Sequence, residues 1–224
     1  LYSILIFSIT AHSADWSTWG GDATRNMVSL ETDLDLDFNP GEMNDDETVD
    51  MSTTQNVKWV AKLGSQAYGN VTIGNGRVFA GTNNESPRDE GKKGDRGVVM
   101  CFDEKSGELD WQLVIPKLGA GKVSDWEYIG VCSSPAIEGD RVYVVTNKCE
   151  VVCLDIAGFS NGNDGPFMDE ASYVKPKGTQ DLLNEKLDAD ILWIYDMRDQ
   201  LGVFPHNVTS SSPLIIGDNI FVAT

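Results

Sequence analysis

The sequence has little positive charge. Its 224 residues include 17 lysines and arginines against 35 aspartates and glutamates, which gives a formal net charge of −18. Because a phosphate backbone is bound by a basic surface, this balance argues against nucleic-acid binding. The sequence also lacks an apolar run long enough to span a bilayer, so we predict no transmembrane span.

Cysteine is scarce as well. The four cysteines, Cys101, Cys132, Cys149 and Cys153, are too few for a disulfide scaffold in a chain of this length. Export would allow one pair to oxidise, but we favour structural thiols. Cys149 and Cys153 have neither a second cysteine pair nor a nearby histidine, which argues against a zinc site. The missing CxxCH motif argues against a c-type haem.

Both ends of the sequence look truncated. Residues 1–9 are almost wholly apolar and lead into the small-residue stretch 11–14, an order typical of the tail of a secretory signal peptide. We therefore predict residues 1–14 to be a signal-peptide remnant of a periplasmic or secreted protein, with a buried strand as the alternative. Residues 219–224 stop inside a predicted strand, so we expect a fragment.

Three stretches of the sequence repeat. Residues 73–79 (IGNGRVF) return as 137–143 (IEGDRVY) and again as 216–221 (IGDNIF). Each copy combines an apolar strand, a tight turn with glycine and a second alternating strand, which predicts a β-hairpin. A third strand follows the first two hairpins, at 98–103 (VVMCFD) and 150–155 (EVVCLD).

A fourth strand with a tryptophan completes each unit. Trp59, Trp111 and Trp193 lie in the apolar segments VKWVAKL, LDWQLVI and ILWIYDM. The insertion 82–97 separates the second and third strands of the first unit, and the insertion 156–188 separates the third and fourth strands of the second unit. Repeated units of four antiparallel strands, with insertions confined to loops, predict an all-β fold, a β-propeller of four-stranded blades. Because a complete ring needs about four to eight blades, we expect an incomplete ring.

The segment 101–111 (CFDEKSGELDW) predicts a tight turn between two strands of one unit. Asp103 and Ser106 can close this turn through side-chain hydrogen bonds to backbone N–H groups. Gly107 would take the left-handed conformation, and Trp111 would lie flat between neighbouring blades.

This segment resembles the blade signature of pyrroloquinoline quinone (PQQ) repeats, Ala-x-Asp-x-x-Thr-Gly-x-x-x-Trp, with cysteine for alanine and serine for threonine. The second unit keeps Asp155 and Trp193 around its insertion. Residues 15–21 and 25–26 are similar to the N-terminal lead segment of exported PQQ-like propeller proteins from aquatic bacteria.

The resemblance implies a division of the chain. Residues 15–56 would form an N-terminal segment with an acidic loop. Residues 57–224 would form a partial propeller: a closing strand around Trp59, two blades and the start of a third.

The loops give no metal site. Residues 31–50 hold nine carboxylates and no base, but Phe38 stands where a calcium-binding EF-hand loop starting at Asp33 needs glycine, so we predict a solvated acidic loop. The insertion 82–97 mixes both charge signs and is also predicted to be a solvated loop. One or two helical turns are expected at 179–187.

The segments that lead into each inner strand are the candidate site. Inner strands line the channel of a propeller, and these segments carry the aromatic, carboxylate, amide and imidazole groups of a polar ligand site. Two of the repeated hairpins are preceded by a Ser-Pro pair, at 134–135 and 212–213. Counting back seven residues from each proline gives Tyr128 and His206, so these two residues should occupy equivalent positions. The alternative is that these side chains only fill the channel mouth. The predicted ligand-binding residues are Trp126, Glu127, Tyr128, His206 and Asn207.

The resemblance also defines two alternative functions. Quinoprotein alcohol dehydrogenases hold PQQ between a tryptophan and a disulfide of adjacent cysteines, with calcium and a catalytic aspartate, whereas Cys132 in this sequence is followed by Ser133. We therefore expect an exported scaffold for a small polar ligand or a partner protein, with no cofactor assigned. The alternative is a PQQ-dependent oxidoreductase whose ligands lie partly in missing blades. A hydrolase acting through His206 has no nucleophile motif to support it.

Overall fold

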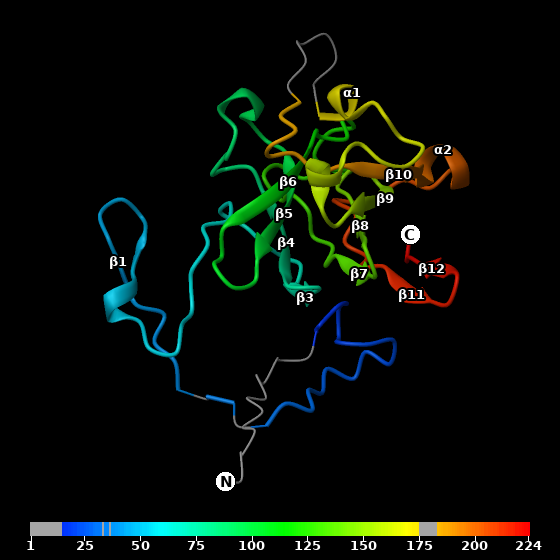
Figure 1. Ribbon diagram of the computed structural model, residues 1–224. Helices are drawn as coiled ribbons and strands as arrows, with labels where there is room; N and C mark the ends of the chain where they lie inside the picture. Colours follow the sequence, from blue (N-terminus) through cyan, green and yellow to red (C-terminus); the bar gives the residue numbers. More distant parts are fainter. Residues whose placement is uncertain (1–14, 33, 36, 175–182) are drawn as a thin grey trace.

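The structure is a computed structural model that describes residues 15–32, 34–35, 37–174 and 183–224 (Figure 1). Within them, strands dominate and form two four-stranded and two two-stranded antiparallel sheets. The all-β prediction is therefore confirmed. The predicted signal-peptide remnant at 1–14 lies outside the described residues.

Each four-stranded sheet is an up-and-down meander, because its strands pair in chain order. The first sheet contains β3 (Thr72–Gly74), β4 (Arg77–Asn83), β5 (Gly97–Asp103) and β6 (Leu109–Ile115). The second contains β7 (Ala136–Glu138), β8 (Arg141–Val145), β9 (Glu150–Asp155) and β10 (Ile191–Asp196). The hairpin of β11 (Leu214–Ile216) and β12 (Asn219–Phe221) follows.

The two meanders share one register. In each, a cysteine on the third strand pairs with an aromatic residue on the second strand and a tryptophan on the fourth. The two rings of each row lie 5.8 Å apart at 52° in the first sheet and 6.0 Å apart at 51° in the second. The rows are Phe79–Cys101–Trp111 and Tyr143–Cys153–Trp193. The strand pairing shifts register next to each of the two tryptophans, so the two sheets share this local irregularity as well.

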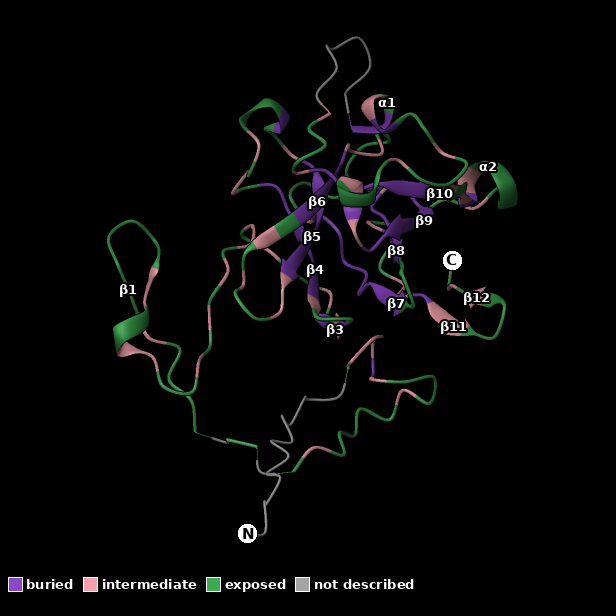
Figure 2. Ribbon diagram, in the orientation of Figure 1, coloured by how far each residue is buried: buried purple, intermediate pink, exposed green. Residues whose placement is uncertain are grey.

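The main core lies between the two meanders, where Figure 2 shows buried strands. Alternating apolar side chains of both sheets, among them Phe79, Leu113, Val142 and Leu154, form one buried cluster. Every second residue of a strand faces the same side, so the alternation read from the sequence is what builds this interface.

Tryptophans join each unit to the next. The indole Nε1 of Trp111 donates to the Ile156 carbonyl (3.0 Å), just after β9. Trp59 Nε1 makes the same bond to the Glu104 carbonyl (2.9 Å), just after β5. Gly107 has φ +75°, and a Cβ there would lie 2.5 Å from the Trp59 ring. Residues 57–63 nevertheless form no strand, contrary to the prediction, because within the described residues no strand lies beside them to pair with.

The loops differ in how far they are solvated. The acidic segment 31–50 is mostly exposed and carries the short strands β1 (Glu42–Met43) and β2 (Val49–Asp50), before the 3-10 turn Met51–Thr53. The prediction that 82–97 is a solvated loop is wrong in part. Its Lys92 is fully buried, with Nζ 2.6 Å from Asp188 and 2.7 Å from Asp89. An ammonium can be buried when carboxylates compensate its charge, and here one comes from the second insertion.

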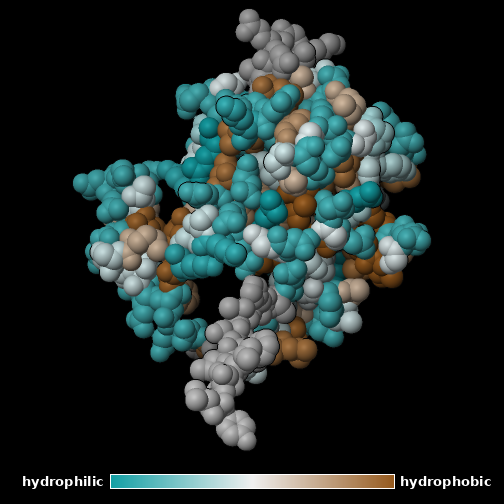
Figure 3. All heavy atoms as spheres, in the orientation of Figure 1, coloured by the Kyte–Doolittle hydropathy of each residue, from teal (hydrophilic) through white to brown (hydrophobic). Residues whose placement is uncertain are grey.

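Helices are few and short. In the described residues they are α1 (Glu170–Val174), α2 (Met197–Leu201) and the 3-10 turns Glu90–Lys92 and Gly158–Asn161, besides the one after β2. None of the described helices has the length and apolar character needed to cross a membrane. Of the predicted helical turns at 179–187, residues 179–182 lie outside the described residues and 183–187 form a non-helical turn. The face seen in Figure 3 is mainly hydrophilic, in keeping with the charge of the chain.

Candidate ligand cleft

At equivalent positions of successive repeats, a backbone N–H donates to a serine hydroxyl of the next repeat. The Asn70 N–H donates to Ser134 Oγ (2.7 Å), and the Ser134 N–H donates to Ser212 Oγ (3.0 Å). The intervals of 64 and 78 residues are those that separate the repeated hairpins. The segments ahead of β3, β7 and β11, which Figure 1 shows one after another along one edge, are therefore joined at matching positions.

A cleft of about 640 Å³ opens on these segments. It is lined by residues from all three repeats and from the N-terminal segment: Trp19, Arg25, Tyr68, Gly69, Asn70, Ile129, Cys132, Ser134, His206, Asn207, Val208, Ser210, Ser211 and Ser212. Hydroxyls, amides and an imidazole dominate, which is the lining of a site for a polar molecule.

The predicted site residues divide into two groups. His206 and Asn207 line the cleft. Trp126, Glu127 and Tyr128 belong to the adjoining loop: the Trp126 N–H donates to the Asn207 carbonyl (2.9 Å), but the Trp126 side chain is 49% exposed. Glu127 pairs with Lys122 (3.1 Å) on the surface, and the Tyr128 N–H donates to Asp95 (3.1 Å). The backbones of the two groups meet, but of the five predicted side chains only those of His206 and Asn207 line the cleft.

Arg25 is the charged residue of the cleft, and the sequence did not predict it there. Its guanidinium lies 5.1 Å from the centre of the Trp19 ring, and Nη2 donates to the Ser212 carbonyl (3.2 Å). Its Nε is buried and has no hydrogen-bond partner. Trp19 and Arg25 belong to the N-terminal segment that carried the family resemblance, but nothing in their spacing indicates a fold-back onto the third repeat.

The cleft is free of carboxylates although the chain is strongly acidic. No aspartate or glutamate of the described residues lines it, and its one permanent charge is that of Arg25. The cleft therefore offers donors and a cation to a ligand, and within the described residues it offers no carboxylate to a metal ion.

The cysteines do not supply a nucleophile. None of the four forms a disulfide, and all are buried. Burial, together with the nearby Asp125 charge, raises the pKa of Cys132 to about 11, and burial raises the pKa of Cys153 to about 12. A thiol with so high a pKa stays protonated at neutral pH and is a weak nucleophile.

Comparison with known proteins adds no assignment. No protein family matches the sequence. No curated protein matches it either. A proposal for the function of the chain must therefore be based on the geometry of the cleft.

Proposed function

We propose that the chain is part of an exported PQQ-repeat-like β-propeller and that its cleft binds a small polar ligand with at least one carboxylate. The observation that carries the proposal is a cleft lined at equivalent positions by three successive repeats, with Arg25 and without a carboxylate. The shared register of the two meanders and the serial bonds through Ser134 and Ser212 support the propeller.

The preference for an anion follows from Arg25. A buried guanidinium nitrogen without an acceptor is unfavourable, by about 1–3 kcal/mol for an ordinary buried polar group. A ligand carboxylate in the cleft would pair with the positive charge of the Arg25 guanidinium, and the serine hydroxyls and the Asn70 amide would bond its remaining polar groups. The stacking on Trp19 holds the guanidinium in place for that contact.

The quinoprotein alternative shares this anion preference, since PQQ carries carboxylates. One feature opposes it: Cys132 lines the cleft but has Val131 and Ser133 as neighbours, so the clamp of adjacent cysteines is missing. PQQ is therefore a probe in the test and not the expected ligand.

Calorimetric titration of the whole chain with citrate, glucose and PQQ plus CaCl2 tests the proposal. We expect saturable binding of citrate, no binding of glucose, and at least a roughly tenfold loss of citrate affinity in Arg25→Gln, since a charged hydrogen bond contributes about 1.5–3 kcal/mol. His206→Ala should lower citrate affinity with a nearly unchanged Tm. Arg88→Gln, at an exposed arginine outside the cleft, is the matched control.

Two outcomes would contradict the proposal. Equal citrate binding by Arg25→Gln and Arg88→Gln would remove the cleft as the site. Stoichiometric PQQ binding that is lost in Trp126→Ala would favour the oxidoreductase. A large fall in Tm of His206→Ala with binding intact would make His206 a scaffold residue.

A further inference from the structure

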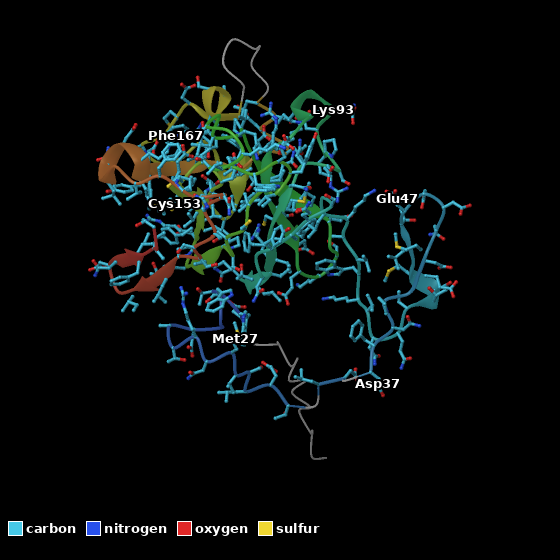
Figure 4. The ribbon with its side chains drawn as sticks, turned by 180° about the vertical axis from the view of Figure 1, so that it is seen from behind. Met27, Asp37, Glu47, Lys93, Cys153 and Phe167 are labelled. Atoms are coloured by element: carbon cyan, nitrogen blue, oxygen red, sulfur yellow. The ribbon has the colours of Figure 1, made fainter. Side chains whose placement is uncertain are left out.

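Three aspartates far apart in the sequence meet beside the second meander. Asp155 ends β9, Asp164 lies in the loop after the 3-10 turn, and Asp190 immediately precedes β10. One carboxylate oxygen of each lies within 4.8 Å of the other two. Figure 4 labels Cys153 on β9 and Phe167 in the following insertion, and Asp155 and Asp164 lie between these two in the chain.

Two of the three aspartates, Asp155 and Asp190, are buried together with the neighbouring Glu170, and no cation of the described residues pairs with them, whereas Asp164 is exposed. Asp190 is 0%, Glu170 1% and Asp155 7% exposed. None of the ion pairs among the described residues includes any of these carboxylates or Asp164. Buried charges in proteins are normally paired or bound to a metal. Asp188, two residues before Asp190, is paired with the buried Lys92 as this rule requires. The three aspartates have no such partner within the described part of the chain.

Asp190 adds an independent sign of a missing partner. Its Oδ2 accepts from the Asp164 N–H (2.9 Å), so the carboxylate faces the group, whereas its buried Oδ1 has no hydrogen-bond partner. Burial, and then the charges of Glu170, Asp155 and Asp164, raise the pKa of Asp190 to about 6. A cation at this position would remove both the unpaired oxygen and the repulsion.

Neighbouring amides hold the oxygens in place. The Asn161 side-chain amide donates to Asp155 (3.3 Å) and to Asp164 (3.1 Å). Asn163 donates to Glu170 (2.9 Å), and its own Oδ1 is buried without a partner. The residue before Asp164 therefore carries a further buried, unpartnered oxygen, which is neutral.

We propose that Asp155, Asp164 and Asp190 bind a divalent cation, and that the cation is Ca²⁺. All three ligands are hard oxygens, which calcium and magnesium prefer and zinc does not. Two oxygens bound to one Ca²⁺ at about 2.3–2.6 Å lie no more than about 5 Å apart, and the three carboxylate oxygens satisfy this limit. Mg²⁺ requires about 2.0–2.1 Å and a strict octahedron and gives up its water reluctantly, so we expect it to bind more weakly than Ca²⁺.

The cation would join the insertion to the body of the protein. It would connect the end of β9, the loop with Asp164 and the start of β10. The same loop contains Gly158, on which the Trp111 ring packs: a Cβ there would lie 2.8 Å from the ring. Binding should therefore stabilise the contact between the two meanders, and it does not depend on a ligand in the cleft.

Titration of the EDTA-treated chain with CaCl2, by calorimetry and thermal unfolding, tests this proposal. We expect one saturable site and a rise in Tm of about 5–10 °C at a hundredfold excess of Ca²⁺ over Kd. MgCl2 should bind roughly tenfold more weakly. Asp190→Asn should lose the calcium-dependent rise and keep at least the calcium-free Tm, because it removes an uncompensated charge. Asp140→Asn, at an exposed aspartate of the same sheet, should behave as the parent.

A second variant keeps the test decisive if Asp190→Asn does not fold. Asp164 is exposed, so Asp164→Asn should fold and still bind Ca²⁺ at least roughly tenfold more weakly. Absence of calcium binding by the parent chain would overturn the proposal. Unchanged affinity in the folded aspartate variants would also overturn it, since the ion would then lie elsewhere, for example on the acidic segment 31–50. Equal affinity for Mg²⁺ would overturn the assignment to calcium.

Discussion

At the scale of single residues, the structure separates charges that are compensated from charges that are not. Lys92 and Asp188 are both buried and neutralise each other. Asp190 is equally buried, but the titratable groups that face it, Asp155, Asp164 and Glu170, are all acidic. Burial is therefore tolerated at Asp188, where Lys92 supplies the opposite charge, and unfavourable for the charged form of Asp190, where the titratable groups nearby are acidic.

Asp190 predicts a specific pH dependence of stability. Its pKa is raised from 3.8 to about 6 in the folded state, so the folded protein binds this proton more tightly than the unfolded chain does. The contribution to stability is complete below about pH 4 and is lost as the pH rises through about 6. In EDTA, the parent should therefore lose more free energy of unfolding than Asp190→Asn between pH 5 and pH 7. Urea unfolding measures this difference, and parallel pH curves would contradict it.

At the scale of elements, one contact recurs: the tryptophan of one unit packs against the segment that follows the third strand of the next unit. Trp59 lies on the β5–β6 turn, and Trp111 lies on the segment after β9. The first turn is closed by Asp103, whose Oδ1 accepts from the Ser106 N–H (2.7 Å) and hydroxyl (2.9 Å). Local side-chain bonds shape the turn, and the indole then fixes it to its neighbour.

A pair of glycines tests this contact. Gly107 and Gly76 have nearly the same φ, +75° and +74°, but a Cβ would meet the Trp59 ring at Gly107 and open space at Gly76. Substitution by alanine at either position should lower the free energy of unfolding by about 1–2 kcal/mol, because the positive φ strains the backbone of any residue with a Cβ. Gly107→Ala should lower the free energy of unfolding by about 1–3 kcal/mol more than Gly76→Ala does, because the Trp59 indole must move. Urea unfolding of both variants measures the difference, and equal losses would show that the Trp59 contact is not tight.

The ion pair between the two insertions provides a second comparison of variants. Lys92→Met leaves Asp188 buried without a counter-charge and should lower the free energy of unfolding by about 3–5 kcal/mol. Lys93→Met removes an exposed ion pair to Glu90 and should change it by less than about 1 kcal/mol. Chemical denaturation compares them. Similar effects of the two variants would contradict the structural role of Lys92.

At the scale of the whole molecule, repetition carries the architecture. Both meanders have the same strand order and the same rows of paired residues, and the third hairpin continues the series of bonds through Ser212. Such an arrangement can be extended by further units, which agrees with the proposed propeller. The cleft opens where successive units meet, so it belongs to the assembly of repeats and not to any one of them.

Export is the prediction that belongs to this scale. If residues 1–9 are the apolar part of a signal peptide, expression of the natural gene in a bacterium should give a mature protein that starts at Ala14 or Asp15. N-terminal sequencing of the exported protein measures this directly. Exported protein that retains residues 1–9 would contradict the prediction.

The sequence by itself determined the strands of the two meanders, the third hairpin and their equivalence, but not the irregular segment 57–63, for which it predicted a strand. Alternating apolar residues, glycine turns and the matching positions of Cys101 and Cys153 are local patterns, and strand register follows from them because side chains alternate with a period of two. The all-β fold could be predicted for this reason. The short helices α1 and α2 could not, since five residues are too few to establish a helical period.

Only the tertiary structure decided which side chains meet. Lys92 and Asp188 are 96 residues apart, and Arg25 and Ser212 are 187 apart, so no spacing rule connects them. His206 was found because it lies beside a repeated strand, whereas Arg25 was missed because the N-terminal segment folds back without a local signal. The aspartates of the proposed calcium site lie at the ends of two neighbouring strands and in the loop between them. Long loops have no fixed period, and their contacts depend on the packing of the strands that they connect.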